Sequence, residues 1–235
     1  MKKQLIALII TVGSFSALAQ NAELKEKKST LNPDAVLIYH VSSNQIKNGP
    51  FYIKKPNNDQ VLLKGAYTDN KRCGNWYFYD DKGQLETCYS YQQDKLAFID
   101  STLLSKIAIN IPGQTDEVAA NSTIPVLLSP MNLFLAQITK ELQIPQEHFQ
   151  DGKPLPIDVI SEIDETGAPK YSVSYKYQDK AIKHDVKLKN SNTFNIEWIP
   201  ASYNKKPIKS QLVVSTAIQS PSDSEDGHQR FKWGY

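Results

Sequence analysis

The chain has 235 residues, of which 40% are apolar, 22% charged and 10% aromatic, with 10 Gly and 13 Pro. This composition is that of an ordinary globular protein, and it excludes a collagen-like, coiled-coil or wholly disordered chain. The length allows one large domain or two small ones, each able to bury a core, and it allows an enzyme without requiring one.

The first 19 residues predict that the protein is exported. Lys2 and Lys3 precede an apolar stretch over residues 5–15, and the small-residue site Ala17-Leu18-Ala19 follows. This is the order of a cleavable secretory signal, and the apolar stretch is shorter than the roughly 20 residues that span a bilayer. We expect cleavage after Ala19 and a periplasmic mature chain without an integral membrane segment. The alternative is an uncleaved N-terminal anchor.

The charge of the mature chain is balanced. Removal of residues 1–19 takes away two lysines and no acid, which leaves 25 basic and 25 acidic residues. Such a chain lacks the long-range field that collects phosphate backbones or anionic lipids. We therefore expect no nucleic-acid partner.

Three stretches are predicted to lie outside folded domains. Residues 20–34 are polar and rich in charge, which is typical of a flexible lead-in. Residues 100–128 form a mixed linker with one strand at 106–111, and residues 219–235 form a polar, mobile tail.

Residues 35–99 predict an antiparallel β-meander built from hairpin repeats. A shift of 25 residues places Gly49 on Gly74 and Phe51 on Trp76, and each copy reads as two strands around a polar turn. A single hairpin is at best marginally stable in water, so the copies must join into one sheet.

Aromatic residues of these hairpins fall on two faces. Side chains alternate along a strand, so Trp76 and Phe78 should share one face while Tyr77 and Tyr79 share the other. Phe51, Trp76 and Phe78 are the candidate aromatic face, which is either covered or used for binding.

The two cysteines, Cys73 and Cys88, are a disulfide candidate. An even count in an oxidising compartment favours a bridge. The hairpin register predicted from the turn places Asn75 opposite Cys88, so the two cysteines are diagonal neighbours about 7 to 8 Å apart, slightly long for a disulfide. A metal site has less support, because two cysteines without neighbouring histidines are an incomplete ligand set.

The hairpin segment resembles a known repeat family. A Gly-x-Trp-Tyr-Phe-Tyr strand from Gly74, an acidic turn with Gly83 and a tyrosine-rich return strand resemble the MORN-like hairpin repeats of the YwqK-type group, over about residues 35–98. The resemblance implies a repetitive sheet used for contacts and carries over no catalytic residue.

Residues 129–218 predict a second, small α+β domain. Ser129 and Pro130 can begin a helix that ends at Pro145. The remaining elements are expected in the order strand 157–163, strand 171–177, helix 179–188 and strand 208–218. With the meander, this makes the expected fold class α+β.

This second domain resembles a TonB C-terminal domain. The resemblance rests on the element order together with Pro145, the stretch Val159-x-x-x-Ile163-Asp164-x-x-Gly167, and Trp198-x-Pro200-Ala201. It implies binding of an extended segment of an outer-membrane transport partner by strand addition. The candidate edge is the last strand, where residues 211–218 carry no charge, and the residues expected to bind the partner there are Gln211, Val213, Ser215 and Ala217. The alternative is an edge covered by the tail or by a second copy, as in a homodimer.

No catalytic, cofactor or metal site is expected. The four histidines are scattered over predicted strand, loop, helix and tail, at His40, His148, His184 and His228. The acidic residues Asp158, Glu162, Asp164 and Glu165 fall on a strand face and in a turn, where neither a calcium site nor a glycosidase pair has further support.

Three functions remain open from the sequence. The first is a non-enzymatic, exported protein whose TonB-like module binds a protein partner, such as an outer-membrane receptor. The second is an envelope module whose aromatic hairpins contact glycan or peptidoglycan. The third, an enzyme of a type that no motif identifies, is not the expectation.

Overall fold

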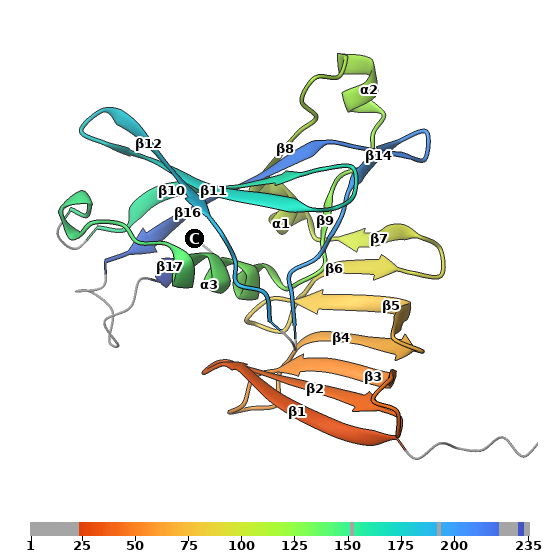
Figure 1. Cartoon of the computed structure of the whole chain (residues 1–235). Helices are drawn as coiled ribbons and strands as arrows, with labels where there is room; N and C mark the ends of the chain where they lie inside the picture. The colour runs from red at the N-terminus through yellow and green to blue at the C-terminus, as the bar shows by residue number, and fades with distance from the viewer. Residues whose placement is uncertain (1–23, 151–152, 192–193, 221–229, 233–235) are drawn as a thin grey trace, which may run out of the picture.

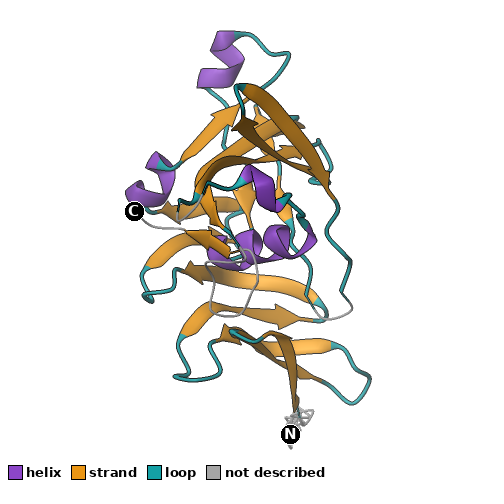
Figure 2. Ribbon diagram, turned by 90° about the vertical axis from the view of Figure 1, so that its left-hand side faces the viewer, coloured by secondary structure: helices purple, strands orange, loops and turns teal. Residues whose placement is uncertain are grey.

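The computed structural model describes residues 24–150, 153–191, 194–220 and 230–232 (Figure 1). The predicted signal peptide and its cleavage site lie outside the described residues. Two β-sheets dominate this part of the chain, and helix α3 (Met131–Glu141) lies between them. The side view in Figure 2 shows the same order of layers.

The first sheet is an antiparallel meander of seven strands in chain order. The strands are β1 (Lys25–Asn32), β2 (Ala35–Val41), β3 (Lys47–Lys54), β4 (Val61–Thr68), β5 (Lys71–Tyr79), β6 (Leu85–Ser90) and β7 (Lys95–Ile99). Figure 1 shows them side by side from β1 in red to β7 in yellow-green. Neighbours along the chain are therefore neighbours in the sheet, as hairpin repeats require.

Strand β1 corrects the prediction of a flexible lead-in over residues 20–34. It pairs with β2 from Lys25 opposite Val41 to Asn32 opposite Ala35, with one irregularity near its end. Its side chains are mostly polar, so the apolar content gave no sign of a strand. Main-chain hydrogen bonding to an existing sheet edge supplies the order.

The second sheet is also antiparallel, with the order β12-β11-β10-β16-β17, and β8 pairs with β16 as well. Its strands are β8 (Ile107–Asn110), β10 (Leu155–Ile163), β11 (Pro169–Tyr177), β12 (Lys180–Val186), β16 (Ser210–Gln219) and β17 (Arg230–Lys232). Two small pairs join β9 (Val126–Leu127) to β13 (Trp198–Ile199) and β14 (Ala201–Tyr203) to β15 (Lys206–Ile208).

The expected α+β class is wrong, because the described chain is mainly β. Besides α3 it contains only the short elements α1 (Ser101–Ser105), α2 (Asp116–Ala120) and the single-turn 3₁₀ helix η1 (Gln146–His148). The helix predicted at 179–188 is strand β12. Gln178 and Asp179 have φ of 47° and 62°, and this two-residue turn sends the chain back beside β11.

Helix α3 packs on both sheets at once. Leu133 belongs to the core cluster of the meander, whereas Phe134, Leu135 and Ile138 belong to that of the second sheet. Val126, Leu128 and Phe194 also cover the meander, outside its own sheet. The two halves are thus held by shared apolar packing around one helix.

Candidate functional site

The candidate aromatic face lies in the core. Trp76 and Phe78 are 0% exposed and Phe51 is 1% exposed. The rings pack on each other, with centroids of Phe51 and Trp76 5.3 Å apart. The predicted division of faces is confirmed, because Tyr77 and Tyr79 remain partly exposed. A binding role for Phe51, Trp76 and Phe78 in contact with solvent is excluded by their burial.

Cys73 and Cys88 are free thiols, so the predicted disulfide is wrong. In the β5–β6 pair Tyr79 lies opposite Leu85, and the register shifts once more at Phe78, so Tyr77, not Asn75, lies opposite Cys88. Cys73 is then four residues away along the strand, about 13 Å at the usual rise, which is beyond the reach of a disulfide. The Sγ atom of Cys73 lies 3.3 Å from Oγ1 of Thr68.

Of the candidate edge residues Gln211, Val213, Ser215 and Ala217, all but Ser215 are paired on both sides of the strand. Strand β16 pairs with β10 along one side, and its other side pairs with β8 at Gln211 and Val213 and with β17 at Ala217. Strand β8 comes from the predicted linker, where the sequence had indicated a strand. The last long strand in the sequence is therefore central in the sheet, and the prediction of an edge was wrong.

The solvent face of the meander carries a continuous row of cross-strand neighbours. Tyr52 pairs with Lys64, Lys64 with Tyr77, Tyr77 with Cys88, and Cys88 with Phe98. Directly paired residues project from the same face of a sheet. Phe98 is 43% exposed, and Lys64 is also exposed. The row thus places rings and a cation on one face of the sheet, and its one buried member is Cys88, which is 5% exposed.

Lysines and tyrosines contact each other across this row. The Nζ atom of Lys64 lies 4.7 Å from the ring centroid of Tyr77 and 5.9 Å from that of Tyr79, and Nζ of Lys54 lies 5.7 Å from that of Tyr52. A hydrogen bond with Tyr79 and the charge interaction with its hydroxyl raise the pKa of Lys64. We call these five residues, Tyr52, Lys54, Lys64, Tyr77 and Tyr79, the tyrosine–lysine face.

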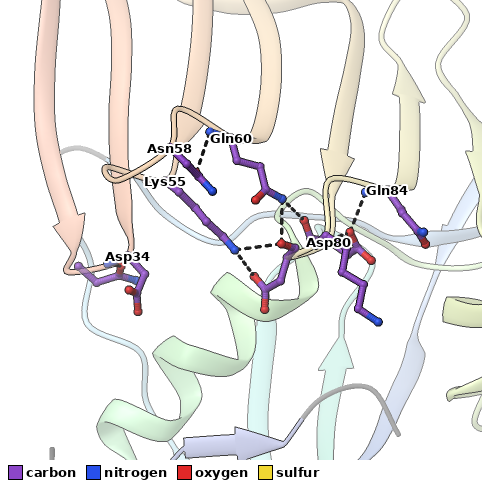
Figure 3. Close-up of polar contacts among 9 residues, drawn as sticks. Asp34, Lys55, Asn58, Gln60, Asp80 and Gln84 are labelled. Atoms are coloured by element: carbon purple, nitrogen blue, oxygen red, sulfur yellow. Dashed lines mark hydrogen bonds and ion pairs between the residues drawn. The ribbon is translucent and has the colours of Figure 1, made fainter.

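The hairpin turns at one end of the meander repeat the same local bond (Figure 3). Asn32, Asn58 and Asp80 each accept a hydrogen bond on a side-chain oxygen from the main-chain N–H two residues later, at 2.8, 3.1 and 2.9 Å. Such bonds favour turns, because they replace hydrogen bonds that the backbone loses there. The turn at Asp80 has Gly83 at φ 80°, as the sequence predicted.

Two of these turns are joined to each other. Nε2 of Gln60 donates to the carbonyl of Asp81 at 2.8 Å, and Nζ of Lys55 donates to the same carbonyl at 3.0 Å (Figure 3). The first hairpin copy is thereby held to the second at its tip, in addition to the strand pairing. This bonding fixes the strands that carry the tyrosine–lysine face.

Arg72 links the buried face of the meander to the C-terminal half. Its guanidinium stacks 4.4 Å from the ring centroid of Trp76, donates to the hydroxyl of Tyr91 at 3.1 Å, and pairs with Glu197 at 3.1 Å. Burial alone would lower the pKa of Arg72, but Tyr91, Glu197 and Tyr67 hold it above the ordinary value. The Arg72 side chain is only 7% exposed, although Glu197 is 55% exposed, and its contacts join the two halves of the molecule, so we interpret the cluster as structural.

Glu86 is a buried carboxyl beside a cavity of about 30 Å³, room for one or two water molecules. Its side chain is among the apolar residues Leu96, Leu103 and Val126, and Oε2 accepts the main-chain N–H of Met131 at the start of α3, at 3.3 Å. Burial raises the pKa of Glu86 to about 7. The cavity is too small for an organic ligand.

Two of the four histidines, which the sequence left scattered, meet in the structure. His148 and His184 both contact the hydroxyl of Tyr175, at 2.8 and 3.1 Å. They lie 36 positions apart in the sequence, and no local spacing could have revealed the contact.

The acidic residues of the second sheet do not converge on one point. Asp158 accepts a hydrogen bond from Ser215, Glu162 lies 3.9 Å from Lys183, and Asp164 accepts bonds from the N–H groups of its own turn. In the described ranges, no group of three or more His, Cys, Asp or Glu side chains is placed to hold a metal ion.

Within the part of the chain that the structure describes, no helix has the length and apolar character needed to cross a membrane. Comparison with known proteins adds no relative: no protein-family profile, curated protein or solved structure matches this chain. The resemblances to MORN-like repeats and to TonB C-terminal domains therefore stay predictions.

Proposed function

We propose that this chain is an exported, non-enzymatic binding protein of the cell envelope, and that its tyrosine–lysine face binds an anionic glycan of the cell wall. The observation that carries the proposal is the row from Tyr52 through Lys64 to Tyr77, which is continuous over three strands and has an exposed lysine between two partly exposed tyrosines.

The chemistry of the face suits a sugar polymer that carries carboxylates. A tyrosine ring offers a flat apolar surface for the C–H face of a sugar and a hydroxyl that hydrogen-bonds at its rim. Lys64 and Lys54 have flexible stems, so their ammonium groups can leave the rings and pair with a carboxylate. The ring faces then become free for the sugar.

The geometry of the sheet supports recognition of an extended ligand. Neighbouring strands lie about 4.8 Å apart, so Tyr52 and Tyr77, two strands apart, are separated by about 10 Å across the sheet. The bonds from Lys55 and Gln60 to the Asp81 carbonyl hold those strands together. A rigid surface loses little conformational entropy on binding.

The test is co-sedimentation of residues 20–235 with purified peptidoglycan. We expect the wild-type chain to sediment and each of Tyr52→Ala and Tyr77→Ala to weaken binding at least about fivefold, the effect of losing a contact worth 1 kcal/mol or more. Lys54→Gln combined with Lys64→Gln should weaken it as well. Raising the salt from about 0.1 to about 1 M shortens the screening length from about 10 to about 3 Å and should release the protein.

Matched controls lie on the other half of the molecule. Tyr203→Ala and Lys206→Gln change the same residue types on β14 and β15. They should leave sedimentation unchanged. If these controls weaken binding as much as Tyr77→Ala does, or if the wild-type chain stays in the supernatant, the glycan proposal fails. Recovery of an outer-membrane receptor in a pull-down from envelope extract would instead favour the hypothesis of a protein partner.

A further inference from the structure

The contact of His148 and His184 with one hydroxyl is a cluster that the proposed function does not use. His148 is in η1, after α3, and its Nδ1 lies 2.8 Å from Oη of Tyr175. His184 is on the edge strand β12, and its Nε2 lies 3.1 Å from the same oxygen. One loop and one sheet edge thus bring two imidazole nitrogens to a single phenol oxygen.

The number of protons limits how Tyr175 and the two histidines can hydrogen-bond to each other. The phenol has one proton, so it donates to only one of the two imidazoles. The other imidazole has to donate its own N–H to the oxygen. At least one ring nitrogen therefore directs a lone pair towards Tyr175.

The rings are held in place by packing. Tyr175 is 4% exposed, and the ring of His184 is stacked on it with an interplanar angle of 14°. On the other side, the ring of Tyr177 lies over His148, with centroids 4.0 Å apart. Both histidines are partly exposed, so an ion from solvent can reach them.

Three donor atoms of kinds that bind metal ions lie together, since both imidazole nitrogens are within 3.1 Å of the phenol oxygen. With bonds of about 2.0 Å, neighbouring donors around an ion are about 2.8 Å apart in a square plane and about 3.3 Å apart in a tetrahedron, so these two separations fit either geometry. Imidazole nitrogen and phenolate oxygen suit copper, which also has the highest affinity among the divalent first-row metals.

We propose that His148, Tyr175 and His184 form a binding site for Cu²⁺. The ion takes the place of the two hydrogen-bonding protons: the phenol proton leaves to solvent and the oxygen binds as phenolate, while the imidazole that donated its N–H carries that proton on its other ring nitrogen and binds through the lone pair this frees. Water completes the coordination. The proposal is independent of glycan binding, since Tyr175 and His184 lie on the second sheet, His148 lies in η1, and none of the three lies on the meander.

The test uses residues 20–235 and Cu²⁺ alone, followed by calorimetry, electron paramagnetic resonance and visible absorption. We expect one ion per chain, a signal split by two nitrogens, and a phenolate-to-copper charge-transfer band. His184→Ala and His148→Ala should each weaken binding about 100-fold or more, since even outer-shell changes cost 10- to 100-fold. Zn²⁺ should bind more weakly than Cu²⁺.

Two further variants keep the test decisive. Tyr175→Phe leaves both imidazoles in place and should abolish the charge-transfer band. His40→Ala combined with His228→Ala removes the remaining histidines and should change nothing. The proposal is wrong if copper affinity survives His184→Ala, if the band survives Tyr175→Phe, or if the double control loses the site. Unfolding of each copper-free variant, followed by circular dichroism, separates loss of the site from loss of the fold.

Discussion

The same strands form both faces of the meander, but the rings on one face are buried and those on the other are partly exposed. On one face, Phe51 and Trp76 are buried under α3 and its neighbouring segments. On the other, Tyr52 and Tyr77, the very next residues, reach solvent and contact lysines. A sequence rich in aromatic residues therefore does not by itself predict a binding surface. The alternation of side chains along each strand shows which rings are buried and which reach solvent.

The largest expected effect separates these faces by stability. Trp76→Ala empties the centre of the meander core and should lower the free energy of unfolding by about 3 to 5 kcal/mol. Urea unfolding followed by circular dichroism measures it. Trp76→Phe should cost much less, because the ring is kept and Nε1 of Trp76 has no hydrogen-bond partner among the described residues. Equal losses in both variants would contradict the packing account.

The pH dependence of stability tests the role of Glu86 at the junction between the meander and α3. The pKa of Glu86 rises from 4.5 in the unfolded chain to about 7 in the fold. Its contribution to the free energy of unfolding is therefore complete below pH 4.5 and is lost as the pH rises through 7. The loss amounts to about 3 kcal/mol. Glu86→Gln should flatten the stability curve between pH 4.5 and 7 and be more stable than the wild type at pH 8.

The exposed Glu165→Gln serves as the control for this experiment, and its stability curve should follow that of the wild type. A Glu86→Gln curve that falls as steeply as that of the wild type would place the titrating group elsewhere.

A smaller effect sharpens the view of how Trp76 is held. A Cβ atom added at Gly65 would lie 2.4 Å from the indole ring, although the backbone there allows any residue. Gly65→Ala should therefore cost about 1 to 3 kcal/mol by displacing the ring. The shift should be visible in the near-ultraviolet circular dichroism. In the Trp76→Ala background, Gly65→Ala should hardly change the free energy of unfolding, because the ring is gone. If it costs as much there as in the wild type, the loss comes from the backbone at residue 65 and not from the ring.

The smallest expected effect is on the solvent face. Tyr77→Ala removes a partly exposed ring and should change the free energy of unfolding by less than about 1 kcal/mol. The same urea experiment compares it directly with Trp76→Ala. A loss near 3 kcal/mol would mean that Tyr77 is a core residue and would remove the basis for a binding face.

The sequence was most informative where local rules decide the structure. The 25-residue repeat, the turn at Asp80 with Gly83, and the alternation of Trp76 and Tyr77 all follow from turn chemistry and strand periodicity. The helix predicted at 179–188 failed because its lysines suit either a helix or an edge strand, and the Gln178-Asp179 turn decides between them. That turn needs two positive φ values, and Gln and Asp do not predict positive φ as Gly does.

Long-range pairing was beyond the sequence. The burial of β16 between β10 and β8 joins segments about 100 residues apart, and Asn110 even bonds Gln211 at 3.0 Å. The meeting of His148 with His184 depends on the same tertiary placement. The tyrosine–lysine face was predicted only in part: Tyr77 and Tyr79 were assigned to the right face, but Tyr52, Lys54 and Lys64 were not recognised as their neighbours.

The most direct test of a binding role for the solvent face is a nuclear magnetic resonance titration of residues 20–235 with soluble peptidoglycan fragments. We predict shifts of the amide signals of Tyr52, Lys64 and Tyr77, which saturate together, while signals from β11 and β12 stay in place. Shifts confined to the second sheet, or none at millimolar fragment, would contradict the account.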